Sequence, residues 1–489
     1  MRGLVGHALK ALAYGIAGGS VVLVAILWLL LDRRPDLEVW HKAALDAEFT
    51  ADSPVRRFED YVVLEKRLFE QLDARILNRV PAGDREPINR YHRGSLSDPG
   101  RWPVNWNRTF ELKPAAPRAG VLLLHGMSDS PYSLRSLGRR LHASGAWVIG
   151  LRLPGHGTAP SGLLRVQWED MAAAVRLAMR YLDRKVKARP LYLVGYSNGG
   201  ALAVHYALSG LEDTALPQVG KLVLISPSIG VSSLATLAKW QLRLGRMVGF
   251  EKLEWNSILP EYDPFKYNSF AINAAHQVYR ITNEIQVKLD SLGAAGALNR
   301  FPPVLAFQSV VDATVSTRAV VEGLFKKLPA GGHELVLFDI NRVSGVKQLL
   351  KIDAKPEIEA AFNDPGRSFA ISLVTNAGEK SLDTVLLHQE TGGAPAARIP
   401  FDTKWPAYLY SLSHVALPFP VDDPLYGMHG SSDRSKIHLG NIGLRGERGV
   451  LKVTAADRLR LRSNPFYPYL ERRLLEFVRL STENESPVK

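Results

Sequence analysis

The stretch PLYLVGYSNGGALAVHYALSG, residues 190–210, decides the fold. It begins with an apolar run of strand length, turns at Gly195, Ser197 and Gly199, and continues in small and apolar residues typical of a buried helix. A serine between such a strand and helix has the pattern of a nucleophile elbow, whose glycines let the backbone close tightly. A plain Gly-Ser connection is the alternative, and the surrounding sequence favours the elbow.

Further apolar runs of strand length flank this stretch: GVLLLH (120–125), WVIGLRL (147–153), KLVLISPS (221–228), PPVLAFQSVVD (302–312) and HELVLFDI (333–340). Helical patterns separate them, at 130–145, 168–186 and 316–328. Strands without polar alternation are buried on both faces, and helical crossovers between them make neighbouring strands parallel. The sequence therefore predicts an α/β fold with a doubly wound, mostly parallel sheet.

The composition excludes several classes of protein. The chain has 489 residues, no cysteine, and 61 Lys and Arg against 48 Asp and Glu, a net charge of +13. Without cysteine there is no disulfide framework, zinc ribbon, iron–sulfur site or thiol nucleophile. The charge fits nucleic acid, anionic lipid or a merely basic surface. No nucleic-acid-binding motif is present, so we expect no nucleic acid partner.

Residues 11–31, ALAYGIAGGSVVLVAILWLLL, carry no charge. As a helix they would measure roughly 31 Å, close to the thickness of a bilayer core. A cleaved signal peptide is the alternative, but the exit WLLLDRRPD has no small-residue cleavage site. We therefore expect a single-pass N-terminal anchor, in a bacterial inner membrane. Positive residues are balanced on the two flanks, and we lean towards an extracytoplasmic catalytic domain.

The pattern divides the chain into seven parts. They are a transmembrane anchor (1–34), a helical and irregular extension (35–106), a first core part (107–231), a helical cap insertion (232–301), a second core part (302–341), a second insertion (342–404), and a third core part with a C-terminal helix (405–489).

A serine nucleophile needs a base, and the base needs an orienting acid, in the chain order Ser…Asp…His for this topology. Asp312 ends an apolar strand, whereas Asp339 lies inside one, so we favour Asp312 as the acid. His414 ends AYLYSLSH (407–414), which we predict to be a strand that delivers the ring to the sheet edge where the elbow opens. His388 is the next choice.

The tetrahedral oxyanion of acyl transfer needs N–H donors. The N–H of Asn198, directly after the serine, is the first candidate, and the N–H of Met127 in the loop HGMSDSP is the second. In contrast, we expect His125 and His156 to hold loops by hydrogen bonds rather than to act as bases.

The motifs HGMSDSP, LRLPGHGTAP, GYSNGG, VVDATV and SLSHV, in this order, resemble the α/β-hydrolase superfamily. The LPGHG segment resembles the branch with monoglyceride lipases, lysophospholipases, carboxylesterases and serine-aminopeptidase-like hydrolases. The resemblance covers roughly residues 107–341 and 405–481. It implies a catalytic triad of Ser197, Asp312 and His414. It also implies an oxyanion hole formed by Met127 and Asn198, and a cap, residues 232–301, that shapes the acyl pocket.

This resemblance implies a serine hydrolase that cleaves carboxylic esters through an acyl-enzyme, and residues 11–31 lead us to expect that it is anchored in a membrane. The expected substrate is a small-molecule or lipid ester, and no metal or organic cofactor is needed. Thioester or peptide cleavage by the same groups is an alternative. A non-catalytic hydrolase-like scaffold that binds lipid or a membrane partner is the alternative from another class.

Overall fold

The computed structural model of the chain describes residues 7, 10–19, 22, 32–230, 251–343, 354–393, 395–428, 433, 435–440, 460 and 463–480. Everything stated below about the structure concerns these residues.

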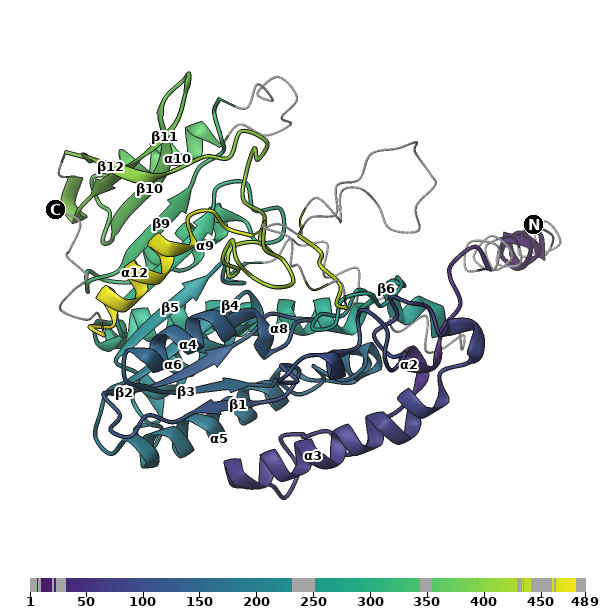
Figure 1. The fold of residues 1–489 in the computed structure, drawn as a ribbon. Coiled ribbons are helices and arrows are strands. Elements are labelled where there is room, and N and C mark those ends of the chain that lie inside the picture. Colours follow the sequence, from purple (N-terminus) through teal and green to yellow (C-terminus); the bar gives the residue numbers. More distant parts are fainter. Residues whose placement is uncertain are drawn as a thin grey trace.

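A ten-stranded sheet forms the centre of the molecule, in the order β1-β3-β2-β4-β5-β8-β9-β10-β11-β12 (Figure 1). Its strands are β1 (Phe110–Leu112), β2 (Ala119–Leu124), β3 (Ala146–Leu151), β4 (Leu191–Tyr196), β5 (Lys221–Ile225), β8 (Val304–Ser309), β9 (Glu334–Phe338), β10 (Ala370–Gly378), β11 (Ser381–Gln389) and β12 (Ala397–Lys404). The pairings from β3 through β10 are parallel. Those of β1, β11 and β12 are antiparallel. The predicted doubly wound, mostly parallel sheet is confirmed.

Helices cover both faces of the sheet (Figure 1). From residue 35 on, the α-helices that the structure describes are α2 (Val39–Lys42), α3 (Phe58–Arg75), α4 (Arg135–Ala143), α5 (Trp168–Val186), α6 (Asn198–Glu212), α8 (Ile272–Ala294), α9 (Thr317–Gly323), α10 (Lys355–Phe362) and α12 (Tyr467–Phe477). A separate two-stranded sheet pairs β6 (Trp255–Ser257) with β7 (Phe270–Ala271).

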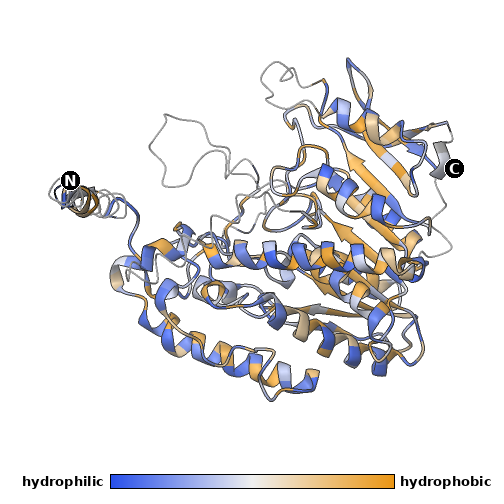
Figure 2. Cartoon of the chain, turned by 180° about the vertical axis from the view of Figure 1, so that it is seen from behind, coloured by the Kyte–Doolittle hydropathy of each residue, from blue (hydrophilic) through white to orange (hydrophobic). Residues whose placement is uncertain are grey.

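Two hydrophobic cores follow from the period of two along buried strands. In β2, Leu122 and Leu124 face the core built with α5, α6 and α8, whereas Val121 and Leu123 face the core built with α4 and α12. Every residue of β2, β4, β8 and β9 is buried, which is why these strands show no polar alternation. Figure 2 shows the resulting hydrophobic interior of the sheet.

The prediction of a strand at 407–414 is wrong. This segment is an irregular connection that passes the ends of β8 and β9, where its Leu412 carbonyl accepts from Ser309 Oγ and its Tyr410 carbonyl accepts from the N–H of Asn341. The place beside β9 is already taken by β10, which pairs with it in parallel. The segment therefore cannot pair with β9, despite its apolar pattern.

Residues 370–404, which the sequence placed in a second insertion, extend the main sheet. β10 continues the parallel order, and β11 and β12 add an antiparallel edge. The edge strand β12 carries Pro400 and alternates between exposed and half-buried side chains, as an unpaired sheet edge requires.

The two segments predicted to lie outside the core are only partly described. Residues 10–19 are helical, whereas 20, 21 and 23–31 of the predicted span lie outside the described residues. Among the helices that are described, none is both long and apolar enough to cross a membrane. Residues 231–250, which hold the first part of the predicted cap, also lie outside the described residues; 251–301 contain β6, β7 and α8.

The N-terminal extension is joined to the core by a buried ion network. The guanidinium of Arg152, just after β3, is 2.8 Å from Glu48 Oε1 and 3.2 Å from Glu65 Oε2. Glu65 lies on α3 and also accepts from the N–H and hydroxyl of Thr109. The Arg152 side chain is only 1% exposed. A charge so deeply buried is tolerated because several carboxylate oxygens surround it.

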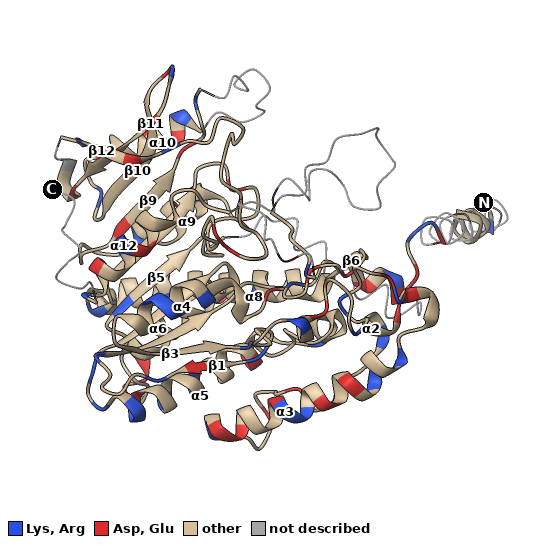
Figure 3. Ribbon diagram, viewed as in Figure 1, with Lys and Arg blue, Asp and Glu red and all other residues tan. Residues whose placement is uncertain are grey.

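The charged surface differs from this buried network. Lys and Arg occur on several separate elements, including α3, α4 and α12 (Figure 3). Some of the ion pairs at the surface, such as Arg93 with Asp73, have both side chains about half exposed. Pairs of this kind contribute little to stability because water and salt screen them.

We expect Arg152→Met to lower the free energy of unfolding by about 3–5 kcal/mol, because it leaves the carboxylate of Glu65 buried without its cation. Arg93→Met, which removes an exposed arginine paired with Asp73, is the matched control and should cost less than about 1 kcal/mol. Urea denaturation followed by circular dichroism measures both. Equal losses in the two variants would show that the network does not join the extension to the core.

Candidate active site

Ser197 occupies a strained turn between β4 and α6. Its φ of 54° and ψ of −118° lie outside the regions that side chains normally adopt. A Cβ at position 199 would fall 2.0 Å from the carbonyl oxygen of Leu124, and one at position 195 would fall 2.4 Å from that of Gly199. Only glycine fits at these two positions, and this backbone approach accounts for the G-x-S-x-G pattern.

Backbone hydrogen bonds hold the strained serine in place. Its N–H donates to the carbonyl of Ile225 at the end of β5, and its carbonyl accepts from the N–H of Ser228 and of Gly200. The backbone of Ser197 is thus hydrogen-bonded both to the end of the neighbouring strand and to the first turn of α6. A strained backbone conformation persists only where several contacts hold it, and these hydrogen bonds provide such contacts.

The carboxylate of Asp312 is fixed from both sides. Its Oδ1 accepts from the N–H of Thr314 and of Val315, and its Oδ2 accepts from the amide of Gln308 and lies 2.8 Å from Nδ1 of His414. Burial alone would raise the pKa of Asp312, but the His414 ring and these N–H groups outweigh burial, and the pKa is lowered. The carboxylate therefore stays ionised beside the imidazole.

His414 reaches this position on the irregular connection rather than on a strand. Its ring is buried and packs against the ring of Tyr196 with centroids 5.3 Å apart, and its carbonyl accepts from the Tyr196 hydroxyl. Since Tyr196 directly precedes Ser197, the imidazole and the serine are both positioned by the end of β4.

Ser197 and His414 line the same cavity, which has a volume of about 380 Å³. In the described part of the chain, the hydrogen bond of the Ser197 hydroxyl goes to Oγ of Ser228, at 3.4 Å, and not to His414. Nucleophile–base hydrogen bonds are often long or misaligned without substrate, and a rotation about χ1 of Ser197 redirects the hydroxyl. The structure thus brings together all three side chains predicted as a triad, with the last hydrogen bond open.

The two predicted oxyanion donors flank the serine. Met127 lies on the loop after β2 and lines the cavity, and Asn198 is the first residue of α6. Neither backbone N–H has an acceptor among the described residues. Free N–H groups at a helix N-terminus and an adjacent loop suit a developing negative charge.

The other candidates of the sequence analysis lie elsewhere. His388 is on β11, where it contacts Ser372 and Glu390. Asp339 pairs with Arg342. Each makes a local contact away from Ser197.

Two buried histidines hold loops, as expected. His125 Nε2 accepts from the N–H of Leu153, and His156 Nδ1 lies 2.9 Å from the Pro154 carbonyl. Burial is the main reason that the pKa of His156 is lowered to about 4, so its ring is neutral near pH 7.

The sequence analysis did not identify three polar residues of the cavity: Ser228, Asp129 and Lys266. Burial raises the pKa of Asp129 to about 6, although Lys266 lies 3.8 Å from it and opposes that rise. Ser228 follows β5 as Ser197 follows β4, and this shared position after neighbouring strands is the signal that could have identified it. No local pattern marks Lys266, since it lies in an irregular stretch.

Comparisons with known proteins point to the same class of site. Residues 115–339 match the model of the family described as Serine aminopeptidase, S33. A curated relative, the thermostable monoacylglycerol lipase of Bacillus sp. (strain H-257), is 34% identical over 88 residues. That match covers 18% of this chain and 34% of the lipase, so the chain spans about a third of the relative's length.

Two solved structures are similar at low scores. One belongs to the work on LipS and LipT, two metagenome-derived lipolytic enzymes, with a TM-score of 0.36, 20% identity, and coverage of 52% of this chain and 97% of that chain. The other is the monoacylglycerol lipase of Paleococcus ferrophilus, with a TM-score of 0.36, 19% identity, and coverage of 47% and 89%.

The family match and the sheet order support the α/β-hydrolase fold that the sequence predicts.

We expect Gly199→Ala to destabilise the protein by more than about 3 kcal/mol, because the new methyl group meets the Leu124 carbonyl. Gly210→Ala is the matched control on the same helix. Its methyl group would meet nothing closer than the Gln218 side chain at 3.7 Å, and it should be neutral or stabilising by about 0.5–1 kcal/mol. Urea denaturation of both variants measures the difference. A stable Gly199→Ala protein would rule out the close backbone approach.

Proposed function

We propose that the protein is a membrane-anchored serine hydrolase that cleaves carboxylic esters through an acyl-enzyme on Ser197. The observation that carries the proposal is the 2.8 Å contact between His414 Nδ1 and Asp312 at the cavity that Ser197 lines. This contact leaves Nε2 of the same ring as the nitrogen that can take the serine proton.

The chemistry proceeds in two halves. In the first, His414 takes the proton of the Ser197 hydroxyl as its oxygen attacks the ester carbonyl. The N–H groups of Met127 and Asn198 stabilise the tetrahedral oxyanion. His414 then returns the proton to the leaving alcohol, and the acyl group stays on Ser197. In the second half, water takes the place of the alcohol and releases the acid.

Asp312 does not take the proton in this mechanism. Its ionised carboxylate holds the His414 ring in the tautomer with the proton on Nδ1, and it stabilises the imidazolium that forms during attack. The four donors around Asp312, described above, keep the carboxylate in one orientation and resist its protonation.

The substrate proposed is a hydrophobic ester. Apolar side chains make up much of the cavity wall: Met127, Leu259, Phe270, Ala275, Val278 and Val415. Leu259, Phe270, Ala275 and Val278 come from the predicted cap segment 232–301, which supports its role in shaping the acyl pocket. A wall of this kind favours an acyl chain through burial of apolar surface.

The proposed anchor is the helix of residues 11–31. Support comes from the residues directly after it: Arg34 donates to the carbonyls of Lys252 and Trp255, and Lys252 Nζ donates back to the Arg34 carbonyl. The chain leaving the proposed anchor is thus held on the segment that leads into the cavity wall. With so short a connection, the catalytic domain would stay close to the bilayer surface, on the extracytoplasmic side of a bacterial inner membrane in our proposal.

A fluorophosphonate probe, which reacts only with an activated serine, tests the nucleophile. We expect the wild type to be labelled and Ser197→Ala not to be labelled. Ser228→Ala is the matched control, because it removes the neighbouring hydroxyl and leaves His414 in place; its labelling rate should stay within about threefold. Absence of labelling in folded wild-type protein would instead support the non-catalytic scaffold.

Turnover of p-nitrophenyl esters tests the base. We expect His414→Ala to lower kcat by at least about 10⁴-fold, since the serine then has no proton acceptor. His388→Ala, at a histidine on β11, should leave kcat within about twofold. The opposite ranking would move the base to His388. An acyl-chain series of esters, matched thioesters and peptides then defines the substrate class.

Carbonate washing of cell membranes tests the anchor. The full chain should stay in the pellet, and a variant lacking residues 1–31 should move to the supernatant while still reacting with the probe. Release of the full chain by carbonate would disprove the proposed anchor, and it would not bear on the proposed triad. Protease added outside intact spheroplasts should degrade the catalytic domain if it is extracytoplasmic.

A further inference from the structure

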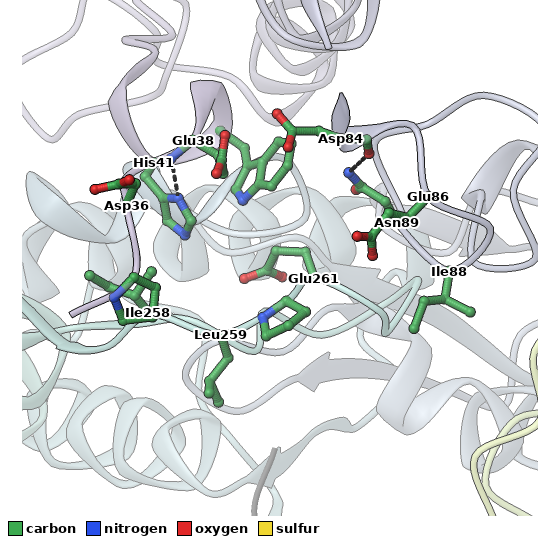
Figure 4. A pocket seen from close by; sticks show the side chains of 13 residues that line it. Asp36, Glu38, His41, Asp84, Glu86, Ile88, Asn89, Ile258, Leu259 and Glu261 are labelled. Carbon is green, nitrogen blue, oxygen red and sulfur yellow. Dashed lines mark hydrogen bonds between the residues drawn. The ribbon is translucent and has the colours of Figure 1, made fainter. Parts of the chain in front are cut away.

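A second cavity, separate from the one at Ser197, lies where the N-terminal extension meets the predicted cap. Its volume is about 490 Å³, which falls within the range of about 300–1,000 Å³ typical of small-ligand sites. Figure 4 shows the thirteen side chains that line it. They come from residues 35–41, 84–89 and 258–261. Leu259 lines both cavities, so one stretch of chain separates them.

The lining of this cavity is strongly acidic. It contains five carboxylates and no Lys or Arg, in a chain whose net charge is +13: Asp36, Glu38, Asp84, Glu86 and Glu261. Asp36 pairs with Lys252. For the other four, the described part of the chain provides no ion pair. In Figure 4, Glu38, Asp84, Glu86 and Glu261 surround the same hollow.

Nearby cations compensate two of these carboxylates only in part, since Arg90 opposes the rise in the pKa of Glu261 and Lys42 opposes that of Glu38. Glu261 is buried and accepts from the N–H of Ser269 at 2.8 Å and of Asn268 at 3.1 Å. Burial, followed by the neighbouring carboxylate of Asp84, raises the pKa of Glu38. Burial likewise raises the pKa of Glu261 to about 7. The carboxylates of Asp84 and Asp36 disfavour the charged form of Glu38, and a positive charge bound beside them would relieve this repulsion.

A second observation also points to a ligand. Trp40 lines the cavity and is 95% buried, being only 5% exposed, yet its indole Nε1–H has no acceptor in the described structure. The ring is fixed by stacking on Tyr91, with centroids 5.1 Å apart. A buried donor without a partner destabilises the protein, and an oxygen atom of a bound molecule at this wall would satisfy it.

The positions of the carboxylates favour a primary ammonium group over a metal ion. Across the residues that the structure describes, no group of His, Asp and Glu side chains is placed to hold a metal ion, so the carboxylates do not converge on one point. A primary ammonium group carries three N–H donors and can bridge carboxylates that are spread around a hollow. A hydroxyl or ester oxygen beside it would accept from Trp40.

We propose that this cavity binds a primary ammonium group with a neighbouring oxygen, as in an amino alcohol. Ethanolamine has this chemistry, both as a free molecule and as the headgroup of phosphatidylethanolamine. Pro35 and Asp36 line the cavity and follow the proposed anchor within five residues, which would bring the cavity to the bilayer surface. The free-ligand site is independent of the proposed hydrolase activity, and only its lipid form depends on the anchor.

Isothermal titration calorimetry of the purified full chain with ethanolamine tests the site. We expect saturable binding that weakens at least roughly tenfold in the double variant Asp84→Asn/Glu86→Gln, in which Asp84 is half-buried and Glu86 is exposed. Asp60→Asn/Glu70→Gln removes the same two charges from the exposed face of α3 and should bind within twofold of the wild type. Absence of binding to the wild type, or an equal loss in both double variants, overturns the site.

A second comparison tests the role of Trp40. Propylamine has the ammonium group of ethanolamine but a methyl group in place of the hydroxyl. The wild type should prefer ethanolamine by roughly fivefold, and Trp40→Phe should lose that preference while still binding both amines. A preference that Trp40→Phe retains overturns the donor assignment.

Vesicles distinguish the two sources of the ligand. The chain lacking residues 1–31 should co-sediment more strongly with phosphatidylcholine vesicles containing phosphatidylethanolamine than with phosphatidylcholine alone, and free ethanolamine should compete. That result supports the lipid headgroup. Ethanolamine binding with equal sedimentation on both vesicles supports a free amino alcohol. Sedimentation that Asp84→Asn/Glu86→Gln leaves unchanged overturns the headgroup assignment.

Discussion

The close approach of two backbones at the end of β4 is the constraint on which the rest of the site depends. The first turn of α6 passes so near to the carbonyls of Leu124 and His125 that no side chain fits at Gly199. This contact holds Ser197 at a positive φ and places its hydroxyl above the edge of the sheet. The N–H of Asn198, the first residue of α6, has no acceptor among the described residues, whereas the N–H groups of Gly200 and Ala201 donate to the Ser197 carbonyl. The strained turn at Ser197 and the free N–H next to it thus share one cause.

The sheet is extended at one side without a change at the strand ends beside Ser197. Residues 370–404 widen the sheet by three strands on the side away from β1, and the carboxyl ends of β4, β5 and β8 keep their positions. The chain then returns across those ends, where the Ser309 hydroxyl and the Asn341 N–H donate hydrogen bonds to its carbonyl groups. His414 lies on this returning segment. Its position therefore depends on the ends of two strands that precede it in sequence by more than seventy residues.

The N-terminal extension is part of the same body. Arg152, Glu48 and Glu65 tie it to the loop after β3, and Arg34 ties its start to the predicted cap. The extension and the cap together enclose the acidic cavity, which shares Leu259 with the cavity at Ser197. A ligand in one cavity would therefore contact the wall of the other. This arrangement would link the N-terminal extension to the cavity at Ser197.

The sequence by itself determined the features that depend on neighbouring residues. The parallel core strands, the elbow at Ser197 and the place of Asp312 after a buried strand can all be read from apolar periodicity and glycine spacing. Only the tertiary structure decided which segments extend the sheet, because the apolar runs 369–375, 383–388 and 407–414 look alike. The first pairs with β9, the second pairs with β10, and the third joins no strand. The contact of His414 with Asp312 and the acidic cavity likewise join residues far apart in the chain. Local sequence patterns do not predict such contacts, because the contacts arise only from the packing of segments far apart in the chain.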